Sequence, residues 1–113
     1  MTKIQSLKRQ DFSKVYNKGQ SKANKYLILY VIKSKDSRLG ISVSKKVGNS
    51  VVRHRVKRLI KEAHRLNASS IKEGYDLVFI GRNTAKDRSY AEIESAVKHL
   101  LKLHKLYESD IIG

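Results

Sequence analysis

The amino-acid sequence predicts one α+β domain, in which helices and strands fold around a shared core. Its 113 residues suffice for a single hydrophobic core, and the apolar fraction of 40% is typical of a folding chain rather than a disordered basic tail. No internal repeat, low-complexity tract or Pro/Gly/Ser-rich linker divides the chain. Stretches with strand periodicity alternate with stretches of helical periodicity in the order α-β-β-α-β-α. We therefore expect residues 1–113 to form one domain.

A short helix and two strands are expected in the first half of the chain. The helix covers residues 7–18, where apolar side chains recur at i, i+3 and i+4, and Gly19 supplies a stop signal. These apolar side chains are Phe12, Val15 and Tyr16. Two β-rich segments follow at 26–33 and 38–45, joined by a polar turn at 35–37. Two strands with a short polar turn between them predict an antiparallel hairpin.

Each of these two strands has two different faces, because successive side chains point to opposite sides. The first strand places Leu27, Leu29 and Val31 on one face and Tyr26, Ile28, Tyr30 and Ile32 on the other. The second places Leu39, Ile41 and Val43 on one face and Gly40, Ser42 and Ser44 on the other. The small and polar face of the second strand leaves room for another group close against the sheet.

A longer amphipathic helix is expected over residues 51–66. At 100° per residue its apolar side chains form one stripe that must bury against the sheet. The stripe consists of Val52, Val56, Leu59, Ala63 and Leu66. Gly48 permits a tight turn before the helix, and either Asn49 or Ser50 can cap its first turn with a side-chain oxygen.

One strand and one helix complete the expected order. The segment "YDLVFIG" at 75–81 is typical of a buried strand, and a loop follows it. Ser89 and Glu92 have the spacing of a capping box, which marks the start of a helix that extends to about Tyr107. The apolar side chains of this helix are Ile93, Val97, Leu100, Leu101 and Leu103.

The positive charge of the chain is concentrated in the longer amphipathic helix. The formal net charge is +15, and the segment 45–65 contributes eight Lys or Arg against one acid, Glu62. An ordinary solvated helix face would interleave acids with these cations to relieve repulsion. The segment also lacks the large aromatic anchors of a membrane-surface helix. We therefore expect a nucleic-acid partner, although the charge does not distinguish DNA from RNA.

The candidate contacts for this polyanion surround the apolar stripe. Lys45 and Lys46 precede the helix N-terminus, where free N–H groups and the helix dipole favour an anion. On the helical wheel the other cations form a broad band opposite the stripe, in which His64 also falls. The expected contacts are Lys45, Lys46, Asn49, Arg53, His54, Arg55, Lys57, Arg58, Lys61 and Arg65.

The residue types needed for a protein-only enzyme are missing or scattered. Cysteine is absent, which excludes disulfides, thiolate metal sites and a thiol nucleophile. The ten acids show no paired motif, and the spacing of His99 and His104 is poor for a metal site. No signal-peptide pattern is present, and the longest apolar run, 26–32, is too short to span a bilayer. We expect a cytoplasmic protein without catalytic residues of its own.

The segment "LGISVSKKVGNSVVRHRVKRLIKEAHR" closely resembles the signature of the bacterial ribonuclease P protein subunit. That signature passes from a strand ending in V-S-K-K through a Gly-Asn turn into a helix with an R-N-R-hydrophobic-K-R core. The positions that match as they stand are Lys45, Lys46, Gly48, Asn49, Arg53, Arg55, Lys57 and Arg58. His54 departs, because the family usually has Asn there. Residues 7–30 and 75–87 also resemble the family.

The resemblance adds detail to the expected fold. It implies the order α-β-β-β-α-β-α, with about four strands in a mixed sheet packed by three helices. The additional strand is expected within 20–45. The family also has an unusual left-handed β-α-β crossover around the basic helix, whereas the general rule favours a right-handed one.

The resemblance also implies a function. The protein would join a catalytic RNA in a holoenzyme, an endoribonuclease that removes the 5′ leader of precursor tRNA by chemistry of the RNA and its Mg²⁺ ions. No further protein partner would be required. The basic helix would contact the catalytic RNA. The leader would lie in a cleft lined by Phe12, Tyr16 and Tyr30, with Lys8 and Arg9 at its side.

The alternative hypothesis is a non-catalytic RNA-binding module, such as a ribosome-associated protein. A helix-turn-helix DNA binder would need a second helix beside the basic one, and the strand at 75–81 argues against it. The RNA that co-purifies with the protein distinguishes the first two readings. A bound RNA of a few hundred nucleotides supports the ribonuclease P reading, and ribosomal RNA alone supports the other.

Overall fold

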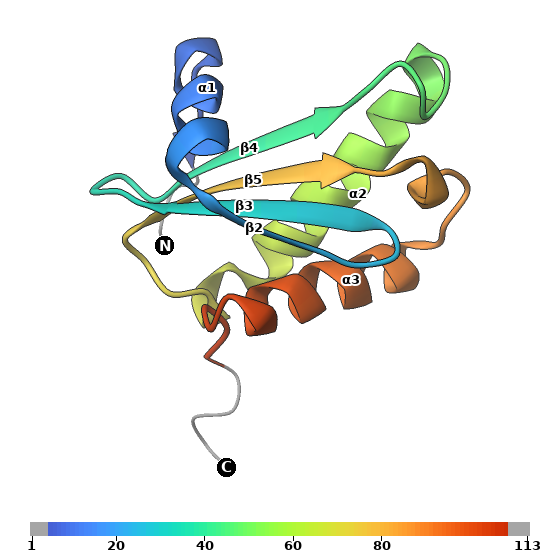
Figure 1. Cartoon of the computed structure of the whole chain (residues 1–113). Coiled ribbons are helices and arrows are strands. Elements are labelled where there is room, and N and C mark those ends of the chain that lie inside the picture. The colour runs from blue at the N-terminus through green and yellow to red at the C-terminus, as the bar shows by residue number, and fades with distance from the viewer. Residues whose placement is uncertain (1–4, 109–113) are drawn as a thin grey trace.

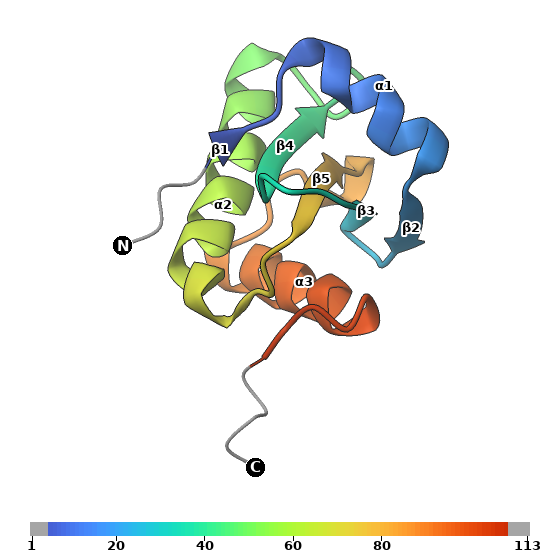
Figure 2. The same cartoon turned by 90° about the vertical axis from the view of Figure 1, so that its left-hand side faces the viewer.

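Five strands form one mixed sheet, with two helices on one face and one helix on the other (Figures 1 and 2). The computed structural model describes residues 5–108. Its elements are β1 (Gln5–Ser6), α1 (Arg9–Lys18), β2 (Gln20–Ala23), β3 (Leu27–Lys33), β4 (Arg38–Val43), α2 (Ser50–Asn67), β5 (Tyr75–Gly81) and α3 (Tyr90–Leu103). Short 3-10 turns follow α2 at Ala68–Ser70 and β5 at Asn83–Ala85. The α+β class and the three helices expected from the sequence are confirmed.

The strand order is β1-β4-β5-β3-β2, and it contradicts the expected hairpin. β5 lies between β3 and β4, pairing antiparallel with β3 and parallel with β4. Val78 of β5 is therefore opposite Tyr30 on one side and Gly40 on the other. The physical reason is that β5 is apolar on both faces, and a central strand buries both. A short turn between β3 and β4 indicates proximity in sequence but does not decide which strand pairs with which.

The connection from β4 through α2 to β5 is a left-handed crossover. β4 and β5 are adjacent and parallel. In Figure 1 both point to the right with β4 above β5, and α2 returns behind the sheet, on the side opposite α1 in Figure 2. The chain runs to the right along β4, returns to the left along α2 behind the sheet, and runs to the right again along β5 below β4 (Figure 1). This path turns in a left-handed sense. This is the arrangement that the family resemblance implied and that the general handedness rule does not predict.

Two strands exceed what the residue periodicity indicated. β2 is the additional strand expected within 20–45, and it pairs antiparallel with β3. The two-residue strand β1 was not expected, so the sheet has five strands rather than about four. β1 pairs parallel with the start of β4, and the next residue, Leu7, is buried and donates its amide to the carbonyl of Leu39 at 2.9 Å. Periodicity could not predict β1, because the strand has two paired residues and one buried side chain after them.

The sheet separates two apolar clusters. The larger cluster lies under α2 and α3. It includes the apolar faces of β3 and β4 that the alternation predicted, together with one face of β5. The smaller cluster lies under α1 and consists of Leu7, Val15 and Val78, with Phe12, Tyr30, Ile32 and Ile80 packed against it. Most of the apolar burial therefore holds α2 and α3 in place, and α1 rests on a much smaller core.

The buried face of α2 is rotated from the predicted one. Leu66 is 54% exposed, whereas Ile60, which lay outside the predicted stripe, is fully buried with Val56 and Ala63. At 100° per residue this shift turns the buried face by roughly 50°. The reason is that α2 packs on β4 and β5 and also on α3, so its inward direction is set by two neighbours at once.

α3 begins where the sequence indicated and ends earlier. Ser89 and Glu92 form the reciprocal capping box, with both side-chain-to-backbone bonds present. The helix ends at Leu103 rather than near Tyr107, and a half-buried His104 follows, with Nε2 2.9 Å from the Leu29 carbonyl oxygen. No helix within residues 5–108 is long and apolar enough to cross a bilayer.

Candidate nucleic-acid interface

The start of α2 brings two lysines and a helix N-terminus together. Asn49 is the N-cap, and its Oδ1 accepts a hydrogen bond from the Val52 amide at 3.0 Å. A Cβ atom on Gly48 would lie 2.8 Å from Cγ1 of Val52, so the close turn into the helix requires glycine. Lys45 and Lys46 are exposed in the loop just before this turn. An anion here would meet the free end of the helix and two ammonium groups.

The ten predicted polyanion contacts lie on α2 and in the loop before it. We call these ten residues the basic band. Its exposed members are Lys45, Lys46, Asn49, His54, Lys57, Arg58, Lys61 and Arg65, and its half-buried members are Arg53 and Arg55. Among residues 5–108, the ion pair of α2 is Arg65 with Glu62, an exposed i, i+3 pair. The side-chain hydrogen bond from Arg65 lowers the pKa of Glu62. The band is therefore a cationic surface with little internal compensation.

Two side chains on one side of α2 are more buried than the helical wheel indicated. His64 is buried rather than available to a ligand, with 8% of its surface exposed, and this burial lowers its pKa to about 4. It is neutral at neutral pH and adds no charge to the band. Arg53 is half-buried, and its Nε atom is covered and lacks a hydrogen-bond partner among the described residues. The rotation of α2 explains both, because it turns this side of the helix toward the core.

Three aromatic side chains from two distant segments meet on the α1 face of the sheet. The ring centroids of Phe12 and Tyr16 are 6.2 Å apart, and those of Tyr16 and Tyr30 are 5.1 Å apart in an edge-to-face arrangement. Phe12 lies over β4, where a Cβ atom on Gly40 would be 2.7 Å from its Cζ atom. The small face predicted for β4 therefore receives the Phe12 ring. We call Phe12, Tyr16 and Tyr30 the aromatic cluster.

The aromatic cluster is open to solvent on one side. Tyr16 is 37% exposed, and Phe12 and Tyr30 are half-buried. Burial raises the pKa of the Tyr16 hydroxyl, against the effect of a hydrogen bond with the Ser42 side chain. Ser42 is the next residue after Gly40 on this face of β4, so polar and aromatic groups adjoin. Such a surface can stack an unpaired base and bond its edge.

The two cations predicted beside the cleft, Lys8 and Arg9, are exposed at the N-terminus of α1. Lys8 is the N-cap residue, and its amide donates to Oδ2 of Asp11 at 3.3 Å. They lie about one helical turn before Phe12. The structure therefore places them on the same helix as two members of the aromatic cluster.

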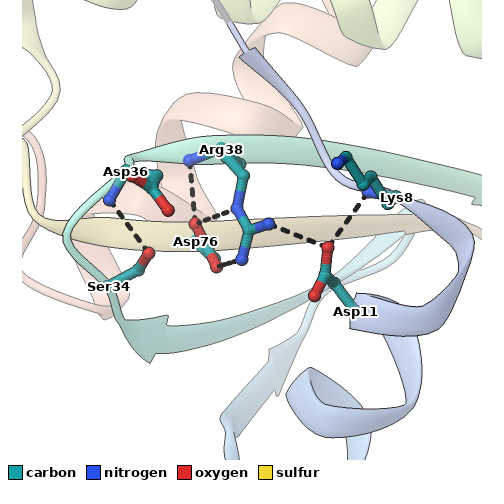
Figure 3. Close-up of polar contacts among 6 residues, drawn as sticks. All are labelled: Lys8, Asp11, Ser34, Asp36, Arg38 and Asp76. Carbon is teal, nitrogen blue, oxygen red and sulfur yellow. Dashed lines mark hydrogen bonds and ion pairs between the residues drawn. The ribbon is translucent and has the colours of Figure 1, made fainter.

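Sequence reasoning missed the ion-pair cluster that joins α1 to the sheet (Figure 3). Arg38 of β4 contacts Asp76 of β5 and Asp11 of α1, at 2.9 Å and 2.8 Å between guanidinium and carboxylate. Burial would raise the pKa of Asp76, but hydrogen bonds from the Arg38 side chain and amide hold it below its usual value. A signal was available: a carboxylate inside the apolar run "YDLVFIG" requires a partner when buried.

The described part of the chain offers no obvious site for a metal ion. Within residues 5–108, no three His, Asp or Glu side chains are grouped closely enough to hold one. His99 and His104 make separate contacts, since Nδ1 of His99 is 3.2 Å from the Asn24 amide nitrogen, and His104 contacts Leu29. Within residues 5–108 the structure therefore indicates no group of metal ligands.

Comparisons with known proteins identify the family. Residues 1–105 match the family model described as Ribonuclease P. The ribonuclease P protein component of Clostridium novyi is 59% identical over 101 residues, covering 86% of this chain and 89% of the relative. That of Lachnoclostridium phytofermentans is 56% identical over 108 residues, covering 93% of each.

Solved structures agree with these relatives. The ribonuclease P protein of Staphylococcus aureus superposes with a TM-score of 0.83 at 38% identity, covering 94% of this chain and 99% of that one. The ribonuclease P protein of Thermotoga maritima gives a TM-score of 0.81 at 29% identity, covering 88% of this chain and 96% of that one. The chain belongs to the ribonuclease P protein family.

Proposed function

We propose that this member of the ribonuclease P protein family binds a catalytic RNA and the 5′ leader of precursor tRNA. In this role it assists endonucleolytic removal of the leader during tRNA maturation. The basic band would contact the catalytic RNA, and the aromatic cluster, with Lys8 and Arg9 beside it, would hold the single-stranded leader. The proposal rests on the family membership and on the chemistry of these two surfaces.

One observation carries the assignment of two RNA surfaces: the cationic and aromatic residues are on different sides of the sheet. α2 packs on one face of the sheet and α1 on the other (Figure 2). The aromatic cluster lies on the α1 face. Cations on a helix suit the phosphates of a folded RNA, which they bind without reading sequence. Partly exposed rings suit unpaired bases, which stack on aromatic side chains. A protein with both surfaces can hold a folded RNA and a single strand at once.

We further propose that the chemistry belongs to the RNA subunit and its Mg²⁺ ions. Hydrolysis of a phosphodiester needs a metal-bound nucleophile or a general base placed at the reacting atoms. The acids of the described residues are either scattered or engaged, as Asp76 and Asp11 are by Arg38. This chain would therefore bind and orient RNA, and it would hold no catalytic residue. The partners are the catalytic RNA and precursor tRNA, with no further protein required, in the cytoplasm.

Reconstitution tests the proposal. The purified protein is mixed with a bacterial ribonuclease P RNA and precursor tRNA at a low Mg²⁺ concentration, where the RNA alone cleaves slowly. We expect the protein to stimulate cleavage at the leader junction. A variant in which Lys57, Arg58 and Lys61 are all replaced by alanine provides the comparison. These side chains are exposed, so we expect the fold to persist and the stimulation to fall as charge is removed from the basic band. Absence of stimulation by the unmodified protein would overturn the proposal.

A further inference from the structure

A single arginine connects three elements around the aromatic cluster. Arg38, at the start of β4, uses Nη2 to contact Oδ2 of Asp76 at 2.9 Å and its backbone amide to donate to Oδ1 at 2.8 Å. Its Nη1 donates to Oδ2 of Asp11 on α1 at 2.8 Å. Asp76 is buried, with 3% of its surface exposed, whereas the Asp11 side chain is 22% exposed. Arg38 is therefore fixed on the sheet by one carboxylate and reaches α1 through the other. We call these three residues the Arg38 bridge (Figure 3).

The Arg38 bridge is attached to α1 next to the residues that form the aromatic cluster. Asp11 immediately precedes Phe12, and Tyr16 follows one turn later on the same face. Phe12 in turn contacts β4 at Gly40, two residues beyond Arg38. The helix is thus held to β4 by an ion pair and by an aromatic contact that are adjacent on both elements. Together these two contacts define how α1 is rotated about its axis.

The rest of the α1 interface is too small to define this rotation by itself. Among the described residues, Val15 is the one buried side chain of α1, and the apolar cluster beneath it has three buried members. The rotation of α1 nevertheless decides whether Tyr16 meets Tyr30, because their edge-to-face contact at 5.1 Å joins α1 to β3. A directional ion pair supplies a constraint that a small apolar contact lacks.

We propose that Arg38 and Asp11 are positioning residues for leader recognition, which hold α1 so that Tyr16 and Tyr30 present one stacking surface. This inference rests on the proposed function of the aromatic cluster. Neither residue needs to touch the leader. Their effect passes through the orientation of α1, and Asp76 serves to fix the guanidinium on the sheet.

The charge of Asp11 allows a clear test, because its direct electrostatic effect on RNA affinity is opposite in sign to the positioning effect. A carboxylate beside a leader cleft repels phosphate, so its removal should tighten RNA binding if it acted only through its charge. The positioning role requires the reverse. Asp11→Ala should weaken binding of the leader even though it makes the protein more positive.

The experiment compares leader-bearing and mature tRNA. Holoenzyme is reconstituted from the catalytic RNA and each protein variant, and the Kd values of precursor tRNA and mature tRNA are measured. For Asp11→Ala we expect precursor binding to weaken by about fivefold, part of what one stacked base contributes, with mature tRNA unchanged. The affinity of the variant for the catalytic RNA should also be unchanged. Asp11→Glu keeps the charge and an acceptor, and it should recover most of the precursor affinity.

Glu92→Ala provides a matched control elsewhere in the chain. Glu92, like Asp11, is the N3 acid whose carboxylate accepts the backbone amide of the N-cap residue, and it also pairs with an arginine, here Arg88 at 3.6 Å. Its replacement changes the net charge by the same amount and removes the same kind of helix cap, but on α3. We expect Glu92→Ala to leave the ratio of precursor to mature tRNA affinity at the wild-type value. An equal loss in both variants would show that capping or general stability is responsible and would overturn the inference.

A second measurement on the free protein separates positioning from stability. The nuclear Overhauser effect between the Tyr16 and Tyr30 rings should weaken in Asp11→Ala, while contacts within the α2–α3 core persist. If Asp11→Ala proves too unstable to assemble, Asp11→Asn keeps the side-chain volume and is measured in the same way. Unchanged or tighter precursor binding in the folded variant would overturn the inference. A wild-type holoenzyme without preference for the leader would instead overturn the proposed leader site, and the inference with it.

Discussion

The cations of α2 and the cation at the start of β4 lie in contrasting surroundings. Arg38 is held between two carboxylates from other elements, Asp76 and Asp11. The basic band on α2 has a single acid at its side, Glu62, which pairs with Arg65 in the described structure. Removing a cation that neutralises a buried acid destabilises the fold, whereas a group of cations without counter-charges is stabilised by an external polyanion. The same residue types therefore serve structure in one region and binding in the other.

The largest expected effect is on stability, and it belongs to the β4 region. Arg38→Met leaves the buried Asp76 carboxylate without its guanidinium partner, which should lower the free energy of unfolding by about 2–4 kcal/mol. Lys57→Met, a matched change in the basic band, should change it by less than about 0.5 kcal/mol. Urea unfolding at neutral pH measures both. Equal losses in the two variants would remove the distinction between structural and ligand-binding cations.

The next effect separates the buried side of α2 from its basic band. Burial lowers the pKa of His64 to about 4, so the unfolded chain binds a proton more readily than the folded one. The stability that neutral His64 provides is complete above its ordinary pKa near 6.5 and is lost as the pH falls toward 4. Between pH 7.5 and 5 this group should cost on the order of 2 kcal/mol. Urea unfolding of His64→Leu should lose that part of the pH dependence, and an unchanged pH profile would contradict the burial of this side chain.

A smaller effect tests the aromatic cluster. Tyr30→Ala removes one ring of the proposed stacking surface, and precursor tRNA should bind the holoenzyme about tenfold more weakly, as expected for one stacked base. Mature tRNA, which lacks the leader, should bind as before. The two Kd values are measured side by side. Equal losses for both ligands would place Tyr30 outside the leader cleft.

The smallest effect per residue is expected within the basic band itself. Arg53→Ala, Arg55→Ala or Lys57→Ala should each weaken assembly with the catalytic RNA by a few fold and reduce the slope of log K against log salt by about 1. Assembly is followed by filter binding at four or five salt concentrations. Arg53 is half-buried, so its replacement should also lower stability, whereas Lys57→Ala should not. Unchanged slopes in all three variants would exclude the band as the catalytic-RNA surface.

The local signals in the sequence predicted most of the elements well. The capping box at Ser89 and Glu92, the N-cap at Asn49 or Ser50, and the β-rich runs depend on residues within seven positions of each other. They predicted the existence and type of all three helices and three of the five strands. The errors came where a neighbour in space decides the outcome. Leu66 is exposed and Ile60 buried because α3 helps to set the inward direction of α2.

The sequence by itself determined the helices, the apolar faces of β3 and β4, the concentration of charge on one helix and the family signature from Lys45 to Arg58. These properties follow from spacing and residue type along a short stretch of chain. Tertiary structure alone decided that β5 separates β3 from β4, that Tyr16 meets Tyr30, and that Arg38 joins Asp11 and Asp76. Those outcomes depend on contacts between residues 14 to 54 positions apart in the chain, from Tyr16 with Tyr30 to Leu27 with Gly81. Their energies arise from pairing and packing across the sheet, which no local period encodes.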